Sequence, residues 1–188
     1  MAPVTLKTAD PRVSFAELQT WPDDGRQYEL YDGEVIVVPA PVSRHQRVAL
    51  HIGLLLNEYE RAHGGLVLVA PVDIVLSEHD VVQPDVVFFR EGRHEALDMA
   101  AAIRIPPDLA VEVTSRSTEM RDRRRKMELF AAFGVPEYWI VDPNRNRLEL
   151  YALRGGAYAA HGVFGAADAV RSATLDGLTF QADVIFAR

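Results

Sequence analysis

An apolar segment, a long helical pattern and a second apolar segment follow one another between residues 109 and 141, and this order restricts the fold more than any other feature of the chain. Residues 109–114 and 137–141 are rich in β-branched and aromatic residues, which is typical of buried strands. The helical pattern between them begins near residue 118 or 119 and ends at Phe133, before Gly134 and Pro136. It is long enough for the crossover that joins two parallel strands. We therefore expect an α/β (α+β) fold in which a mixed β-sheet is flanked by helices.

The first of these strands carries a carboxylate where an apolar residue is expected. Leu109, Val111 and Val113 alternate with Asp108, Ala110, Glu112 and Thr114, so period-two geometry places Glu112 on the face opposite the three aliphatic residues. A carboxylate in the middle of a buried strand needs a cation or hydrogen-bond donors to offset the loss of its hydration. Two such carboxylates on neighbouring strands would form a hard oxygen site suited to Mg²⁺.

The N-terminal half contains recognisable start and turn signals. Ser14 and Glu17 form a capping box that predicts a short helix ending near residues 21–22. Asp32-Gly33 separates residues 27–31 from residues 34–38, which predicts a β-hairpin with a tight turn. Ser43 and Gln46 form a second capping box, and the apolar spacing after them predicts a long helix that ends near Ala62.

The remaining segments complete the expected fold. Strands are expected at 66–70, 72–76 and 81–89, a short helix at about 95–102, and extra C-terminal strands at 148–152, 158–161 and within 178–186. The chain of 188 residues suits one compact domain, 1–188, with a core at about 28–152.

Composition restricts the function. The absence of cysteine excludes thiolate metal ligands and a cysteine nucleophile. A net charge of −7 argues against nonspecific coating of nucleic acid, although Arg116, Arg121, Arg123, Arg124, Arg125 and Lys126 concentrate positive charge near the carboxylate strand. Neither a membrane-spanning run nor a signal peptide is present, so we expect a cytoplasmic protein without a membrane partner.

Three ionisable residues are predicted to meet at one site. Asp85 begins the strand pattern after Pro84, Glu112 lies on the later strand, and Lys126 shares a helix face with Leu129 and Phe130. Asp85 and Glu112 would hold a divalent cation, Mg²⁺ or Mn²⁺, that polarises a phosphodiester, and Lys126 would orient the attacking water or stabilise developing charge. Glu34 is the fourth candidate catalytic residue.

The ordered set of motifs resembles the PD-(D/E)XK nuclease superfamily and, within it, the Uma-two group of restriction-endonuclease-like proteins. The resemblance covers most of the chain and implies a restriction-endonuclease-like core, with Asp85 and Glu112 as metal-binding acids and Glu34 as an accessory acid. It rests on Tyr28-Glu29-Leu30-Tyr31-Asp32-Gly33-Glu34, His45-Gln46, Gln83-Pro84-Asp85, Pro107-Asp108-Leu109-Ala110-Val111-Glu112-Val113, Ser117-Thr118, Asp122, Lys126 and Gly134-Val135-Pro136-Glu137-Tyr138-Trp139-Ile140-Val141-Asp142.

The chain departs from the superfamily pattern at three positions. Thr114 stands where the usual lysine lies, two residues after the second acid, and Lys126 resembles the version in which the lysine lies on the following helix. Phe130 replaces a tyrosine that is frequent in the group, and Arg116 replaces a proline. We expect His45, Gln83 and Thr114 to line the pocket.

Several interpretations stay open at this stage. The leading hypothesis is a Mg²⁺-dependent endonuclease acting on DNA, with a homodimer expected if both strands are cut. A binding or regulatory module that retains the nuclease fold and metal pocket is the second hypothesis, and a two-carboxylate hydrolase of another substrate, such as a glycoside, is the third. Structural interpretations also stay open: Asp85 could be a strand-entry residue and Lys126 a surface lysine. Tyr138 and Trp139 are expected in the core.

Overall fold

The computed structural model describes residues 12–114 and 121–187, with side chains from residue 124 onward in the second range, so Arg116, Ser117 and Thr118 lie outside the described residues. The helices are α1 (Phe15–Leu18), α2 (Ser43–His63), α3 (Arg121–Ala132) and α4 (Asp183–Phe186), with one 3₁₀ turn, η1 (His94–Ala96). The strands are β1 (Gln27–Tyr31), β2 (Glu34–Val38), β3 (Leu66–Val69), β4 (Ile74–Ser77), β5 (Asp80–Val82), β6 (Val86–Phe89), β7 (Leu109–Val113), β8 (Glu137–Asp142), β9 (Arg147–Arg154), β10 (Ala157–Gly165), β11 (Ala169–Arg171) and β12 (Thr179–Gln181).

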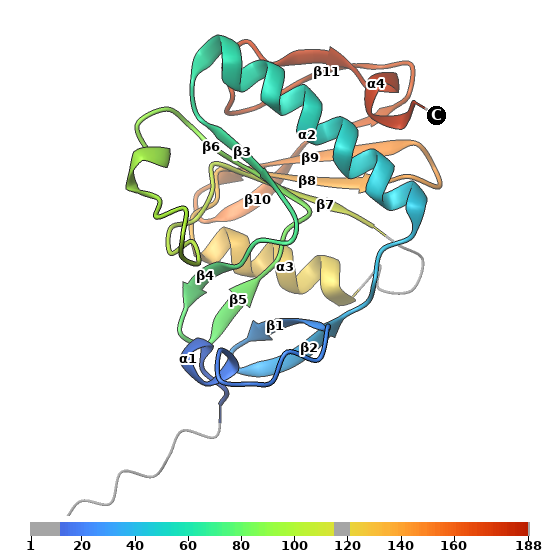
Figure 1. The fold of residues 1–188 in the computed structure, drawn as a ribbon. Helices are drawn as coiled ribbons and strands as arrows, with labels where there is room; N and C mark the ends of the chain where they lie inside the picture. The colour runs from blue at the N-terminus through green and yellow to red at the C-terminus, as the bar shows by residue number, and fades with distance from the viewer. Residues whose placement is uncertain (1–11, 115–120, 188) are drawn as a thin grey trace, which may run out of the picture.

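A six-stranded mixed sheet forms the centre of the molecule (Figure 1). Its strand order is β10-β9-β8-β7-β6-β3, and β7 and β8 are parallel whereas the other neighbours are antiparallel. The chain between these two parallel strands contains α3, which confirms the crossover predicted from the sequence. The α+β fold class with a mixed, helix-flanked sheet is therefore confirmed.

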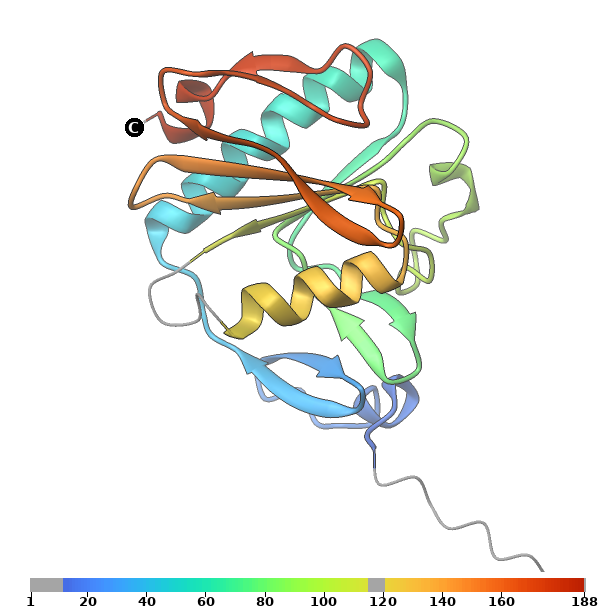
Figure 2. The same ribbon diagram turned by 180° about the vertical axis from the view of Figure 1, so that it is seen from behind.

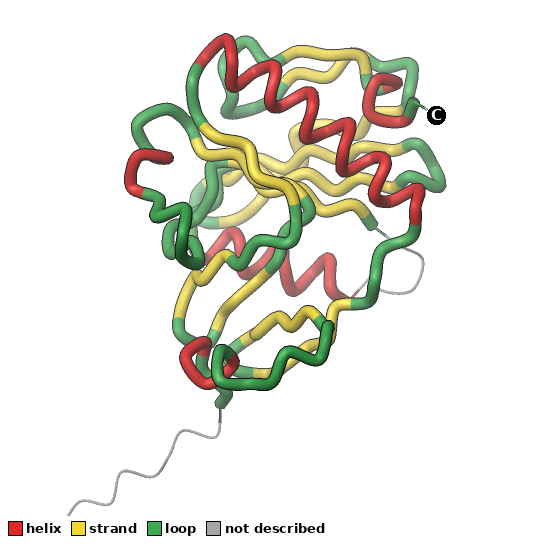
Figure 3. The backbone as a smooth tube through the Cα atoms, viewed as in Figure 1, coloured by secondary structure: helices red, strands yellow, loops and turns green. Residues whose placement is uncertain are grey.

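The two long helices cover opposite faces of this sheet (Figure 3). Leu109, Val111 and Val113 of β7 pack in one core cluster with apolar residues of α2. Ala110 belongs to the other cluster, which includes Phe130 of α3. The alternation predicted for this strand is confirmed, and it directs Glu112 towards the α3 side.

A smaller four-stranded sheet, in the order β2-β1-β5-β4, lies beyond α3 (Figure 2). The hairpin β1–β2 turns at Asp32 and Gly33, whose φ angles of 48° and 76° are those required at both central positions of a type I′ turn. The predicted hairpin is thus confirmed. Its position brings one face of β1 towards α3 and the large sheet.

Three local predictions are wrong. The strand expected at 81–89 is divided, because β5 belongs to the small sheet and β6 to the large one. Residues 95–102 do not form a helix; the chain makes only the turn η1, and Ile103 then forms a bridge with Ile74, so tertiary pairing prevails over helix propensity. Ser43 does not cap α2, because it is the first helical residue and the N-cap is Val42, which makes no side-chain capping bond. Ser14 does cap α1, as expected.

The C-terminal segment combines a strand with a helix. Residues 178–186 contain β12, which pairs with β11, and then α4, which packs against α2. Among the described helices, none has the length and hydropathy needed to cross a membrane.

Candidate active site

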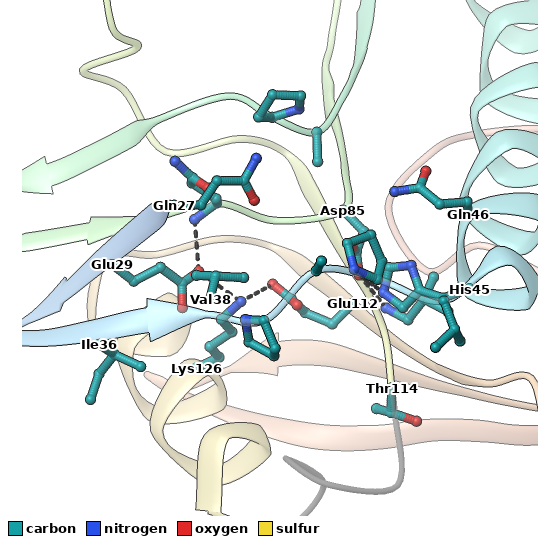
Figure 4. Close-up of a pocket in the computed structure, with 18 of the residues that line it drawn as sticks. Gln27, Glu29, Ile36, Val38, His45, Gln46, Asp85, Glu112, Thr114 and Lys126 are labelled. Carbon is teal, nitrogen blue, oxygen red and sulfur yellow. Dashed lines mark hydrogen bonds and ion pairs between the residues drawn. The ribbon is translucent and has the colours of Figure 1, made fainter. Parts of the chain in front are cut away.

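A cavity of about 300 Å³ lies where the large sheet, the hairpin and both long helices meet. Its walls come from β1 and β2, the chain at residues 39–42, the start of α2, β7 and α3. Asp85, Glu112 and Lys126 all line it, so the three residues predicted from the sequence to share a site do lie together (Figure 4).

The antiparallel register of β6 and β7 brings the two acids to the same face. Val86 pairs with Val111 and Val87 with Ala110, so the next position in the same register sets Asp85 opposite Glu112. Directly opposed residues of an antiparallel pair project to the same side of the sheet. The register of β6 and β7 therefore brings the two acids together, although 27 positions separate them in the sequence.

The Asp85 carboxylate is held on one of its two oxygens. Oδ2 accepts a hydrogen bond of 2.7 Å from the backbone N–H of Val113 and lies 3.2 Å from Nε2 of His45. His45 is buried at the start of α2, and it lines the cavity as expected. Oδ1 of Asp85 makes no hydrogen bond within the described part of the chain.

Lys126 reaches the cavity from α3 and lies between two carboxylates (Figure 4). Its Nζ is 2.8 Å from Oε1 of Glu112 and 2.9 Å from Oε1 of Glu29. All three side chains are largely buried, with exposed fractions of 11% for Lys126, 15% for Glu112 and 6% for Glu29. The ammonium group therefore compensates charges that would otherwise be poorly solvated.

Glu29 is a site residue that the sequence reasoning missed. Its Oε2 accepts a hydrogen bond from the Tyr31 hydroxyl at 2.9 Å, and its Oε1 accepts one from the backbone N–H of Gln83 at 2.8 Å. The available signal was local: Glu29 and Tyr31 are two positions apart on one strand and so share a face. A buried carboxylate on the hairpin is thereby fixed beside Lys126.

The other predicted residues occupy different places. Glu34 lies at the exposed start of β2, outside the cavity lining, and its Oε2 accepts a 2.6 Å bond from Arg125. Gln83 and Thr114 line the cavity. The Thr114 hydroxyl, however, donates to the carbonyl of Val141 at 3.2 Å, which directs it towards β8.

Three carboxylates, those of Asp85, Glu112 and Glu29, surround one ammonium group, that of Lys126, and this excess of acid changes the pKa of Glu112. The pKa of Glu112 is raised to about 8, because burial and the charges of Asp85 and Glu29 together raise it more than Lys126 lowers it. Burial lowers the pKa of Lys126, but Glu112 and Glu29 outweigh burial and hold it well above its usual value. Bound at Glu112, a divalent cation would replace the proton.

Three buried polar atoms at the cavity have no hydrogen-bond partner within the described residues. They are Nδ1 of His45, Oε1 of Gln83 and the hydroxyl oxygen of Tyr138. Tyr138 is fully buried, as predicted for a core residue, and its ring packs against Phe130 and Tyr158. Buried polar atoms are costly to leave unpaired, and these three belong to the wall of the cavity and not to its accessible surface.

The donor set suits a divalent cation that keeps part of its hydration. No group of three or more histidine, aspartate or glutamate side chains in the described ranges gathers in a way that could hold a metal. Asp85 and Glu112 nevertheless each retain one oxygen without a hydrogen bond from a described residue. Mg²⁺ is commonly held by one or two carboxylates together with water and substrate phosphate, so two acids are a sufficient protein contribution.

The large mixed sheet, with α2 and α3 on its two faces, is the architecture expected of a restriction-endonuclease-like protein. The chain belongs to the Uma2 family, described as "Putative restriction endonuclease", whose model matches residues 15–184. This confirms the family resemblance inferred from the motifs.

A solved structure is similar to the chain along nearly its whole length. It is that of a "putative nuclease belonging to DUF820" from Anabaena variabilis ATCC 29413, and it matches with a TM-score of 0.76 and 16% identity. The match covers 93% of this chain and 97% of the other chain. The likeness shows a shared fold. The comparison with curated proteins found no match.

Proposed function

We propose that this protein is a divalent-cation-dependent endonuclease that hydrolyses phosphodiester bonds in DNA. The observation that carries the proposal is the meeting of Asp85, Glu112 and Lys126 at one cavity from three separate elements. Membership of the family described as "Putative restriction endonuclease" supports the same reaction class. We expect the protein to act in the cytoplasm, and to do so as a homodimer if it cuts both strands.

Each residue has a role in this proposal. Asp85 and Glu112 would hold Mg²⁺ or Mn²⁺ with the oxygens that have no hydrogen bond from a described residue, while Val113 and His45 fix the orientation of Asp85. The cation would polarise the phosphate and lower the pKa of a bound water. Lys126 would stabilise the negative charge that develops on the phosphate as water attacks phosphorus and the bond to the leaving oxygen breaks.

Glu29 and Glu34 would assist from different distances. Glu29 shares the Lys126 ammonium with Glu112, so it would set the charge and position of that lysine. Glu34 is proposed as an accessory acid that acts from outside the cavity. Its ion pair with Arg125 joins β2 to α3, the helix that carries Lys126.

A cleavage assay with isosteric variants tests the proposal. Circular single-stranded DNA and plasmid DNA are incubated with the protein in Mg²⁺ or Mn²⁺, and products are followed on gels. We expect cleavage by the wild type, and a loss of about 100-fold or more for Asp85→Asn and Glu112→Gln. Glu58→Gln is the matched control, because Glu58 is an exposed carboxylate of α2 outside the cavity. Equal cleavage by wild type and both site variants would reject the assignment.

The competing function is a binding module without turnover. Two observations favour it: the net charge of −7, which opposes approach of nucleic acid, and the engagement of Lys126 by two carboxylates. Titration calorimetry separates the two functions. Cation binding that Asp85→Asn abolishes, together with no cleavage of any nucleic acid, would establish the binding module.

A further inference from the structure

The acids of the candidate active site are recessed from the surface. The exposed fractions of the Asp85, Glu112 and Lys126 side chains are 17%, 15% and 11%. A scissile phosphate must therefore enter the cavity to reach them. The nucleotide that carries the phosphate has to enter at least partly with it.

The cavity is too small to admit a duplex. A volume of 300 Å³ corresponds to a cube with an edge of about 7 Å, whereas the major groove of B-DNA alone is about 12 Å wide. The volume falls at the lower end of the range for small-molecule sites, roughly 300–1,000 Å³. One unstacked nucleotide matches this scale.

The wall chemistry also differs from that of a surface that tracks a duplex backbone. Among the described residues that line the cavity, Lys126 is the one lysine or arginine, and it is already engaged by Glu29 and Glu112. Duplex binding depends largely on lysine and arginine contacts to successive phosphates. The lining offers no such series within the described residues.

The rim is apolar and exposed. Val37 and Val42 are 50% and 65% exposed, and Pro39, Pro41 and Pro71 line the same opening. Apolar walls with a few directed polar groups are typical of sites that enclose a flat organic group. Gln46, which is exposed and lines the same cavity, supplies such a polar group.

From these observations we propose that the cavity accepts a single unpaired nucleotide, so that the substrate is single-stranded nucleic acid or a duplex with an unpaired position. The inference rests on the proposed nuclease function for the identity of the reaction. Val37 and Val42 would pack against the base, Gln46 would bind its polar edge, and the adjoining phosphate would face Asp85 and Glu112. An intact duplex would first have to extrude a nucleotide, which costs unstacking free energy.

The experiment compares three probes built from one fluorescein-labelled oligodeoxynucleotide: the single strand, the blunt duplex, and the duplex with one bulged nucleotide. Binding is measured by fluorescence anisotropy in Ca²⁺, and cleavage in Mg²⁺ or Mn²⁺. We expect the single strand and the bulged duplex to bind and react at least about tenfold better than the blunt duplex, with cleavage of the bulged probe at the bulge.

Two variants test the pocket without removing its acids. Gln46→Ala removes an exposed polar side chain of the cavity lining, so the free protein should keep its stability while its affinity for the single strand falls about fivefold. Val42→Ser removes apolar rim area at the α2 N-cap, where serine is favourable, and should weaken binding about threefold. Val163→Ser, at an exposed valine of β10 outside the cavity, is the matched control.

The outcomes separate this inference from the proposed function. Blunt duplex cut as fast as the single strand would overturn the inference and leave the nuclease function standing. Preferential binding of the single strand that depends on Gln46 and Val42, without cleavage of any probe, would support the inference and reject the nuclease function. Absence of both binding and cleavage would overturn both.

Discussion

The ammonium of Lys126 lies 2.8 Å from Oε1 of Glu112, although the two residues belong to different elements, α3 and β7. Thr114, two positions after Glu112, has its hydroxyl bonded to Val141 and does not replace this cation. The lysine therefore comes to the acid from the helix that follows the strand.

Replacement of Lys126 is expected to destabilise the fold. Lys126→Met keeps the length of the side chain but leaves Glu29 and Glu112 buried without their shared cation. Removal of one partner of a buried ion pair typically costs about 3–5 kcal/mol of unfolding free energy. Urea denaturation measures the loss at about pH 9, above the pKa of Glu112. The double variant Lys126→Met/Glu112→Gln should recover part of it, and an unchanged midpoint for Lys126→Met would contradict the buried pairing.

The pKa of Glu112 predicts how stability depends on pH. Burial, with added repulsion from Asp85 and Glu29, raises this pKa to about 8 from an ordinary value of 4.5, so the folded state binds the proton more tightly than the unfolded state does. Stability from this group is full below about pH 4.5 and is lost as the pH rises through about 8. Between about pH 6 and about pH 9 we expect a loss of about 2 kcal/mol that Glu112→Gln removes. Chemical denaturation across this range, with and without Mg²⁺, provides the test; a slope that the variant retains would assign the effect to another group.

His45 is expected to act as a positioning residue for Asp85. Its Nε2 lies 3.2 Å from Oδ2, while Oδ1 has no hydrogen bond from a described residue. Loss of such an outer partner typically lowers metal affinity about 10–100-fold, so His45→Ala should weaken Mg²⁺ or Mn²⁺ binding in calorimetry by this factor. His45→Gln, which retains a donor, should restore part of the affinity. His161→Ala, at an exposed histidine outside the cavity, should have no effect.

A comparison of two variants tests whether Glu29 or Glu34 is the accessory acid. Glu29→Gln removes a charge 2.9 Å from Lys126, whereas Glu34→Gln removes one that contacts Arg125 at the exposed start of β2. If the accessory acid acts through Lys126, we expect Glu29→Gln to shift the pH profile of kcat and Glu34→Gln to change the rate less than about tenfold. A larger effect of Glu34→Gln would assign the accessory role to the exposed acid.

The expectation of a single domain predicts cooperative unfolding. The two main core clusters lie on opposite faces of the same strands, so neither can lose its packing alone. Leu56→Ala on the α2 side and Phe130→Ala on the α3 side should each lower one common transition, by about 2–5 kcal/mol. Circular dichroism and fluorescence of the buried Trp139 should report the same midpoint. Two separated transitions would divide the chain into independent units.

The sequence predicted the parts of the fold that depend on local pattern. Alternation in β7, the Asp32-Gly33 turn and the long crossover helix were each expected, because side-chain period and turn chemistry act over a few residues. The helix expected at 95–102 failed because the bridge between Ile74 and Ile103 is a contact that no local propensity reveals.

The sequence likewise predicted those residues of the candidate site that local pattern reveals. Asp85, Glu112 and Lys126 stand out in sequence because each is ionisable within an apolar pattern. Glu29 was missed, because its burial depends on the docking of β1 against α3. In the sequence, 97 positions separate Glu29 from Lys126. Their assignment as cation ligands and catalytic groups stays a prediction that the variants above will test.

The pairing of Val86 with Val111 has a consequence for what changes this chain can tolerate. A slip of one residue between β6 and β7 would turn Glu112 to the α2 side and separate it from Asp85. The exposed part of the connection between these strands, residues 98–101, can therefore be lengthened with little penalty, whereas Ile103, which bridges Ile74, and the buried Asp108 have to be kept. In a library of insertions into this connection, the clones that keep nuclease activity would be those that preserve the register of β6 and β7. Activity would therefore report on strand alignment.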